Sequence, residues 1–163
     1  MLQFANGRYE TMAQCEGDLG QRLRVFFEHA RSLGCSRIVA IGTDSPTLPT
    51  DWVEQSFHLL ASNDVVLGPA FDGGYYLVGT SNECLTIFDD IPWSTSRVLE
   101  TTIARVREAS ARLALLPPWY DVDTVDDWNM LRGHVLALRQ AGLDPQVPRV
   151  ERLIQEESAC RKD

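Results

Sequence analysis

Three short segments carry aspartates whose positions suit metal or phosphate chemistry. Asp44 follows an apolar run in the motif GTDSP, Asp72 begins the motif DGGYY, and Asp121 and Asp123 stand two residues apart in YDVDT. Carboxylate oxygens are preferred ligands of Mg²⁺ and Mn²⁺, and Mg²⁺ usually takes one or two of them together with substrate phosphates. These residue types therefore point to a metal ion that holds a phosphate-bearing substrate.

Each of these aspartates also has a purely structural interpretation. Asp44 before Ser45-Pro46 can bond the following backbone amides in a turn. Asp72 before two glycines is typical of a β-hairpin turn, although paired glycines also let a ligand approach the backbone closely. Asp123 lies next to a helix start at Thr124, where a negative charge complements the helix dipole. Spacing alone leaves both interpretations open for all three segments.

The pair Asp121 and Asp123 would lie on the same side of an extended segment, beside the positive end of the following helix. A D-x-D-x-[TV] pattern after a strand also occurs in aspartyl-phosphate phosphatases, but that fold needs far more chain than the 40 residues that follow Asp123. Trp93, Ser94 and Thr95 place an aromatic face and two hydroxyls together. They suit stacking on a sugar or base, or simply a capped helix with a buried tryptophan.

The surrounding pattern predicts elements that would gather these loops. Apolar runs without alternation predict buried strands at 37–42, 64–68, 75–79 and 113–116. Amphipathic or capped segments predict helices at 18–33, from Thr50, from Ser94 or Thr95, from Thr124 and from about Arg149. Alternating helices and strands indicate an α/β domain with a mainly parallel sheet, in which ligands sit outside the carboxyl ends of the strands. We expect one domain over 1–163, with a linker and a C-terminal helix over 142–163.

Composition restricts the classes of partner. The net charge is −8 and Lys162 is the sole lysine, which argues against a broad nucleic-acid surface. No apolar run approaches the roughly 18 residues of a membrane span, and the first residues lack the apolar stretch of a secretory signal. We therefore expect a cytoplasmic protein with no nucleic-acid partner and no membrane span.

Taken together, the motifs resemble a known family. IGTDSPTLP, DVVLGPAFDGGYYLVG, IFDDIPWSTSRVL and WYDVDTVDDW occur in the order and spacing of a bacterial glycosyltransferase family with a nucleotide-diphospho-sugar transferase (GT-A) fold, some of whose members are arsenosugar-biosynthesis glycosyltransferases. The segment QCEGDLGQR is similar to the family's Q-x-x-G-D-L-G-x-R. The resemblance covers about residues 14–130 and implies a three-layer α/β/α domain.

The resemblance also implies a nucleotide-sugar or nucleotide substrate, and roles for individual residues. Asp44 and Asp123, with Asp121 as the alternative, match the metal-binding carboxylates, which would hold Mg²⁺ or Mn²⁺. The positions that match the nucleotide contacts are Gln14, Gly17, Asp18 and Arg22. The sugar or acceptor side would be lined by Asp72, Gly73, Gly74, Tyr75, Trp93, Ser94 and Thr95, with Asp72 as the candidate general base.

The family pattern begins with a strand and a phosphate-cradling G-x-x-K-T-R-L loop, which this sequence does not contain. We expect that at least one βαβ unit of the family fold is missing, which would leave an unpaired strand edge in the sheet. Three functions follow as hypotheses: a metal-dependent glycosyltransferase, a guanylyltransferase-like nucleotidyltransferase acting on a small phosphorylated acceptor, or an inactive truncated domain. In the last case another chain, including a second copy, would complete the open sheet.

Overall fold

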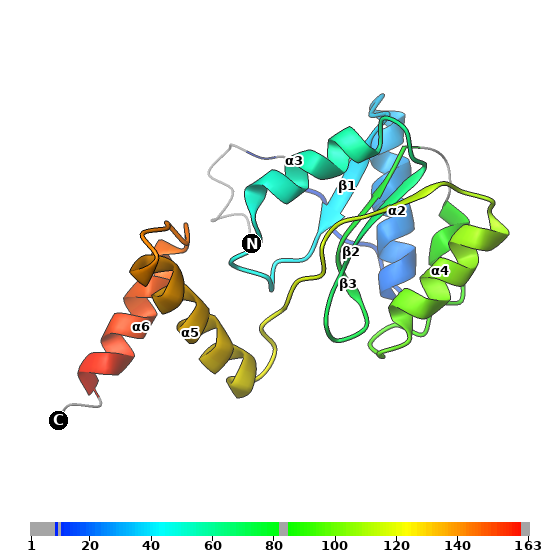
Figure 1. Ribbon diagram of the computed structural model, residues 1–163. Helices are drawn as coiled ribbons and strands as arrows, with labels where there is room; N and C mark the ends of the chain where they lie inside the picture. Colours follow the sequence, from blue (N-terminus) through cyan, green and yellow to red (C-terminus); the bar gives the residue numbers. More distant parts are fainter. Residues whose placement is uncertain (1–8, 10, 82–84, 161–163) are drawn as a thin grey trace.

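The computed structural model describes residue 9 and residues 11–81 and 85–160. The elements follow in the order α2 (Leu19–Ser32), β1 (Ile38–Ile41), α3 (Thr50–Leu59), β2 (Val65–Pro69), β3 (Tyr75–Thr80), the short 3₁₀ helix η1 (Leu85–Phe88), α4 (Val98–Glu108), β4 (Leu113–Leu115), α5 (Val125–Gln140) and α6 (Pro148–Cys160). Figure 1 shows the sheet with its helices on the right and the pair α5 and α6 on the left. All four predicted strands are present, within two residues of their predicted ends.

The sheet is mixed, so the prediction of a mainly parallel sheet is wrong. Its strand order is β1-β3-β2-β4, and β3 runs antiparallel to both of its neighbours, whereas β2 and β4 are parallel. The reason is the tight turn between β2 and β3, in which Ala70 N–H donates to the Gly74 carbonyl at 3.0 Å. A connection this short can join only antiparallel strands.

Although β3 is reversed, β1, β2 and β4 share one direction. β1 and β2 are both antiparallel to β3, and β4 is parallel to β2. Their carboxyl ends therefore lie at the same edge of the sheet. The three acidic segments of the sequence follow these three ends, so the expectation that they share one edge holds despite the mixed sheet.

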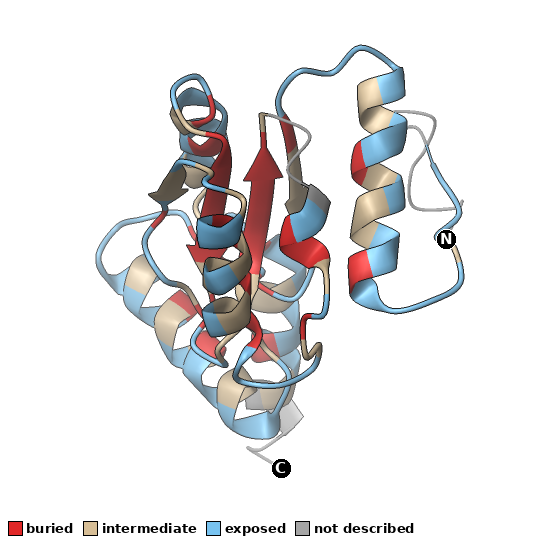
Figure 2. Cartoon of the chain, turned by 90° about the vertical axis from the view of Figure 1, so that its right-hand side faces the viewer, coloured by how far each residue is buried: buried red, intermediate tan, exposed pale blue. Residues whose placement is uncertain are grey.

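Helices cover both faces of the sheet, which gives the three layers. On one face, α2, η1 and α4 contribute to a core that includes Phe27, Ile87 and Val106 with strand residues such as Val65 and Leu67. On the other face, α3 packs through Trp52 and Val53 on a cluster around Val66. Figure 2 shows that the burial is concentrated in the strands and on the inward sides of the helices.

The C-terminal pair α5 and α6 forms a separate small core. Leu131 and Val135 of α5 pack with Ile154 of α6 and with Tyr120, which lies just ahead of α5 in the chain. Arg139 on α5 and Glu151 on α6 add a two-pronged contact, with 2.9 Å between Arg139 Nη2 and Glu151 Oε2. Tyr120 joins this pair to the chain segment that carries Asp121 and Asp123.

The first residues of the helices can be compared with the helix starts predicted from the sequence. Asp18 caps α2 and Thr124 caps α5, each in a capping box, in agreement with the helices predicted over 18–33 and from Thr124. The helix start expected at Thr50 is confirmed, although Thr50 does not cap the helix, whereas the start expected at Ser94 or Thr95 is wrong. Thr50 is the first residue of α3, after Pro49, and α4 begins at Val98, after Arg97. Thr95 uses its hydroxyl to donate to the Pro92 carbonyl at 2.7 Å, which makes a turn rather than a cap.

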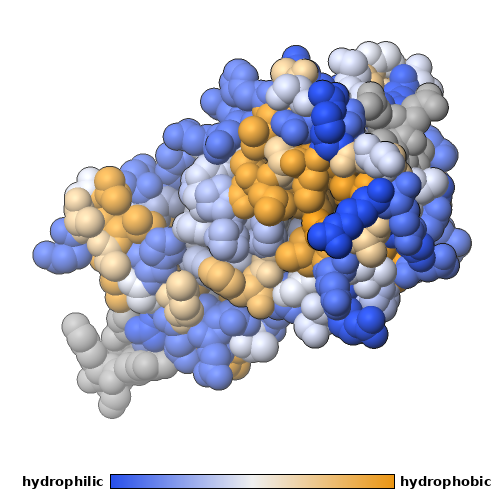
Figure 3. Space-filling view, turned by 45° about the vertical axis from the view of Figure 1, so that its right-hand side comes forward, coloured by the Kyte–Doolittle hydropathy of each residue, from blue (hydrophilic) through white to orange (hydrophobic). Residues whose placement is uncertain are grey.

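One edge of the sheet is formed by β1, which within the described part of the chain pairs only with β3. Ile41, the last residue of β1, is 51% exposed. Figure 3 shows hydrophobic side chains gathered in the middle of one face and bordered by hydrophilic ones. Association of another strand with this edge stays a prediction. Among the described helices, none has the length and apolar character that crossing a membrane requires.

Candidate functional site

A cavity of about 800 Å³ lies at the edge where β1, β2 and β4 end. Its walls come from the end of β1 and the following loop, the turn between β2 and β3, β3 itself, the segment before α4, the segment before α5 and the first turns of α2. Asp44, Asp72, Asp121 and Asp123 all line it. The structure thus brings together the carboxylates that the sequence suggests for a metal or substrate.

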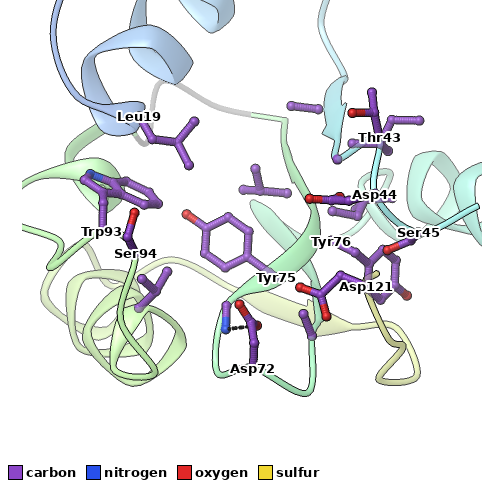
Figure 4. Close-up of a pocket in the computed structure, with 18 of the residues that line it drawn as sticks. Leu19, Thr43, Asp44, Ser45, Asp72, Tyr75, Tyr76, Trp93, Ser94 and Asp121 are labelled. Atoms are coloured by element: carbon purple, nitrogen blue, oxygen red, sulfur yellow. Dashed lines mark hydrogen bonds between the residues drawn. The ribbon is translucent and has the colours of Figure 1, made fainter. Parts of the chain in front are cut away.

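Backbone hydrogen bonds fix the acidic segments relative to one another. Val122 N–H, between Asp121 and Asp123, donates to the Asp44 carbonyl at 3.0 Å. Phe71 N–H, next to Asp72, donates to the Trp119 carbonyl at 3.2 Å. Figure 4 shows the carboxylates of Asp44, Asp72 and Asp121 directed toward the same space. Backbone hydrogen bonds therefore hold the acidic segments together.

The backbone at Gly42 makes room for Asp44. A Cβ atom on Gly42 would lie 2.6 Å from Asp44 Oδ1, which is closer than a real Cβ contact. The Asp44 side chain thus lies over the preceding backbone and remains in the cavity wall. The glycine of the motif GTDSP leaves this space free for the Asp44 carboxylate.

Burial and the neighbouring negative charges both act on the carboxyl group of Asp121. Partial burial raises the pKa of the Asp121 carboxyl because desolvation disfavours the charged form. The neighbouring carboxylates of Asp72, Asp123 and Asp44 raise it further by repulsion. Its own backbone amide acts in the opposite direction. A cation bound beside Asp121 would therefore reduce the repulsion between its carboxylate and the neighbouring ones.

The donor set can be compared with what a divalent ion requires. In the described ranges, no group of three or more His, Cys, Asp and Glu side chains is placed so that it could hold a metal ion. Mg²⁺, however, commonly binds through one or two carboxylates and completes its shell with water and substrate phosphates. Asp44 and the Asp121/Asp123 segment, joined through Val122, fit such an open site.

Asp72 lies in a hairpin turn, which is the structural alternative that its sequence allowed. Its Oδ1 accepts a hydrogen bond from Gly74 N–H at 2.7 Å. Gly73 has φ of +91°, and a Cβ atom there would lie 2.2 Å from the Ser96 carbonyl oxygen. Leu99 N–H donates to the Gly73 carbonyl at 2.8 Å. The hairpin is thus fastened against the start of α4, with Asp72 and Gly74 in the cavity wall and Gly73 outside it.

An aromatic wall stands opposite the acidic one. The rings of Tyr75 and Trp93 meet edge to face, with 6.3 Å between centroids and 82° between planes. Burial raises the pKa of Tyr75, because the phenolate is disfavoured away from water. Ser94 has φ of +61°, a conformation rare for a residue other than glycine, and it turns the chain so that Trp93, Ser94 and Thr95 all line the cavity.

The predicted nucleotide contacts are placed differently from one another. Gln14 lines the cavity, and Arg22 donates to its side-chain oxygen at 3.2 Å. Asp18 caps α2 by accepting from Gln21 N–H at 2.8 Å, and Gly17 forms the preceding turn with φ of +112°. Only Gln14 of these four lines the cavity. Nucleotide binding by all four stays a prediction.

Sequence reasoning missed a buried hydrogen-bonded group beside the site. The Tyr120 hydroxyl lies 2.6 Å from Thr47 Oγ1 and 2.7 Å from His134 Nδ1. The three residues come from the loop after β1, the segment before α5 and α5 itself. Because these segments are far apart in sequence and the residues form no local motif, the pattern of the sequence contains no signal for this group. It links the Asp44 loop to the Asp121 segment.

The fold and the cavity define an α/β protein similar to nucleotide-diphospho-sugar transferases. The crystal structure of a "putative nucleotide-diphospho-sugar transferase" from Desulfovibrio desulfuricans G20, at 1.90 Å resolution, is 33% identical to this chain with a TM-score of 0.80. The similarity covers 92% of this chain and 64% of that one, so the chain spans somewhat less than two thirds of the length of its relative.

The family follows from the sequence match. Residues 2–95 match a family described as an uncharacterized protein conserved in bacteria (DUF2064). This is more than half of the chain, which therefore belongs to this bacterial family. A comparison with curated proteins gives no match. The expected resemblance to nucleotide-diphospho-sugar transferases is confirmed at the level of the family and the fold. The narrower arsenosugar assignment is not tested.

Proposed function

We propose that this protein is a transferase that uses a nucleotide-sugar donor. The observation that supports this most strongly is the convergence of Asp44, Asp72, Asp121 and Asp123 on one cavity at the carboxyl ends of the strands. The similarity to the Desulfovibrio protein agrees with this proposal, because that structure is described as a nucleotide-diphospho-sugar transferase of putative function. The donor's diphosphate would lie along the acidic segments and its sugar against the aromatic wall.

We further propose that Asp44 and Asp123, with Asp121 as the alternative, hold Mg²⁺ or Mn²⁺. The chemistry of the donor set supports this, because carboxylates held at one place by backbone hydrogen bonds suit a hard cation. Repulsion among the carboxylates, which raises the pKa of Asp121, gives the cation a further favourable interaction. When bound, the ion would neutralise charge on the diphosphate leaving group.

Asp72 is the candidate general base. In the proposed reaction an acceptor hydroxyl oxygen forms a bond with the anomeric carbon, and the bond from that carbon to the diphosphate breaks. The electron pair leaves with the nucleoside diphosphate, and the hydroxyl proton passes to the Asp72 carboxylate. Its hydrogen bond from Gly74 N–H uses one oxygen, which leaves the other available in the cavity. Trp93 and Tyr75 would orient the sugar ring by contact with its apolar face.

The products distinguish this reaction from the nucleotidyl transfer that the sequence also allows. The protein would be incubated with nucleotide-sugars and, separately, with nucleoside triphosphates and sugar phosphates, each with MgCl₂ or MnCl₂. We expect a nucleoside diphosphate to be released from at least one nucleotide-sugar. Pyrophosphate formed from a triphosphate, with no diphosphate from any nucleotide-sugar, would establish the nucleotidyltransferase instead.

Asp44→Ala tests the role of the carboxylates in that reaction. We expect turnover to fall by about a hundredfold or more, the usual effect of removing one electrostatic group from an active site. Asp51→Ala is the matched control, because Asp51 is an exposed carboxylate in the first turn of α3 and does not line the cavity. Metal-independent turnover that Asp44→Ala leaves unchanged would rule out the proposed metal site.

A further inference from the structure

Ser45 has a buried hydroxyl that the folded chain does not use. Ser45 is 8% exposed, and its Oγ atom has no hydrogen-bond partner within the described part of the chain. A buried polar group without a partner loses its hydrogen bonds to water and destabilises the folded state. In native proteins such groups commonly bind a ligand, an ion or a water molecule.

The position of Ser45 shows which space its hydroxyl serves. Ser45 lines the cavity, and Figure 4 shows it on the same wall as Asp44 and Asp121. The loop around it is held on both sides. Leu48 N–H donates to the Ser45 carbonyl at 3.0 Å, and the Asp44 carbonyl accepts from Val122 N–H. Thr47 is fixed by the Tyr120 hydroxyl at 2.6 Å. The hydroxyl is therefore placed in the wall by a restrained backbone.

Its chemistry differs from that of its neighbours. Ionised carboxylates only accept hydrogen bonds, whereas a serine hydroxyl also donates one. Phosphate oxygens are acceptors, so the carboxylates of this wall cannot hydrogen-bond them directly, but Ser45 can. We propose that the Ser45 hydroxyl binds the donor by donating a hydrogen bond to a phosphate oxygen of its diphosphate group. This inference rests on the proposed function and adds a binding residue to it.

Ser45→Ala separates ligand binding from folding. The probes are UDP, GDP and ADP with MgCl₂, and the corresponding nucleosides, titrated into wild type and variant by calorimetry. For the diphosphate that wild type binds, we expect about ten- to a hundredfold weaker binding by the variant, as for a lost hydrogen bond to a charged group. Affinity for the nucleoside should stay the same. The melting temperature without ligand should be equal to that of wild type or higher, because no internal hydrogen bond is removed.

Ser56→Ala is the matched control. Ser56 is also a buried serine, with no exposed area, but its hydroxyl donates to the Val53 carbonyl within α3 and it does not line the cavity. This variant should show the opposite pattern, with a lower melting temperature and unchanged affinity for the diphosphate. Two buried serines that differ in this way would show that the effect at Ser45 is specific to the ligand.

The outcomes separate the two proposals. If wild type binds a nucleoside diphosphate and Ser45→Ala binds it equally well, the role of Ser45 is overturned and the proposed function stands. If Ser45→Ala loses stability while its affinity is unchanged, the hydroxyl is structural and its role in binding is again overturned. If wild type binds none of the diphosphates with MgCl₂, the proposed function fails and the role of Ser45 fails with it.

Discussion

At Asp121, burial and three neighbouring carboxylates act on one side chain in the same direction. They raise the pKa of its carboxyl above the ordinary value of 3.8. A site that gathers negative charge for a ligand is thereby less stable without that ligand. Natural active sites often show this conflict between function and stability.

Asp121→Asn should therefore stabilise the ligand-free protein at neutral pH. In wild type, at pH values between 3.8 and the raised pKa, the folded state keeps a proton that the unfolded state has already lost. The contribution of Asp121 to the free energy of unfolding consequently falls as pH rises from about 3.8 through its raised pKa. The asparagine variant lacks this dependence. Urea unfolding of both proteins from pH 4 to pH 8, without divalent ions, measures the difference. A variant less stable than wild type at pH 7 would contradict the prediction.

The sequence indicated the acidic wall because three acidic segments each follow a predicted buried strand, although each aspartate alone also had a structural interpretation. It did not separate the residues that line the cavity from those that shape it. Asp18 caps α2 and Gly17 forms the turn before it, so the structure gives both residues local structural roles. The unused hydroxyl of Ser45 could not be predicted, because an unpaired group is visible only once every neighbour has been placed.

Among the elements, the β2–β3 hairpin depends on a glycine whose role can be measured. Gly73→Ala would combine a left-handed backbone at φ of +91° with a clash against the Ser96 backbone. We expect it to lower the free energy of unfolding by about 2–4 kcal/mol. Gly34→Ala is the control, since Gly34 has a similar φ of +88° and open space where the Cβ would lie. Strain alone should cost about 1 kcal/mol there. Equal losses in urea unfolding would show that the contact with Ser96 is unimportant.

The hydroxyl group of Tyr120 joins elements that the sheet does not connect directly. Tyr120→Phe would leave Thr47 and His134 without this partner, and we expect a loss of about 1–3 kcal/mol. Thr47→Val should also destabilise the protein. Because both changes remove the same hydrogen bond, the double variant should lose less than the sum of the two. A double-mutant cycle in urea tests this, and strictly additive losses would mean that the two hydroxyls are not coupled.

Elements were predictable where their signals are local. The capping boxes at Asp18 and Thr124 and the apolar stripe of α2 each lie within a few consecutive residues. The start of α4 was misplaced because serine and threonine also close turns, as Thr95 does with the Pro92 carbonyl. For the segment that contains Asp72, a hairpin turn was one of the two interpretations of the sequence. Had the hairpin been chosen, it would have predicted that β3 runs antiparallel to β2.

At the scale of the whole molecule, that one hairpin decides the sheet. It reverses β3 and places it between β1 and β2 in the sheet. The sequence does not indicate that β1 pairs with β3, because the two strands are far apart along the chain. The common direction of β1, β2 and β4 survives, so the predicted meeting of the acidic segments was correct although the sheet type was not. The relative from Desulfovibrio desulfuricans G20 extends beyond the part that this chain matches. Transferase activity of the kind that a protein of the relative's full length would have is therefore proposed for this chain.

The most direct test of the account is whether the cavity binds a nucleotide-sugar through a divalent ion. Nucleotide-sugars of different bases and sugars would be titrated calorimetrically into the protein in MgCl₂ and again in EDTA. We predict binding of at least one of them in MgCl₂ and its loss in EDTA, because the acidic wall repels a diphosphate unless a cation lies between them. Absence of binding to every nucleotide-sugar, or equal binding in MgCl₂ and EDTA, would contradict the account.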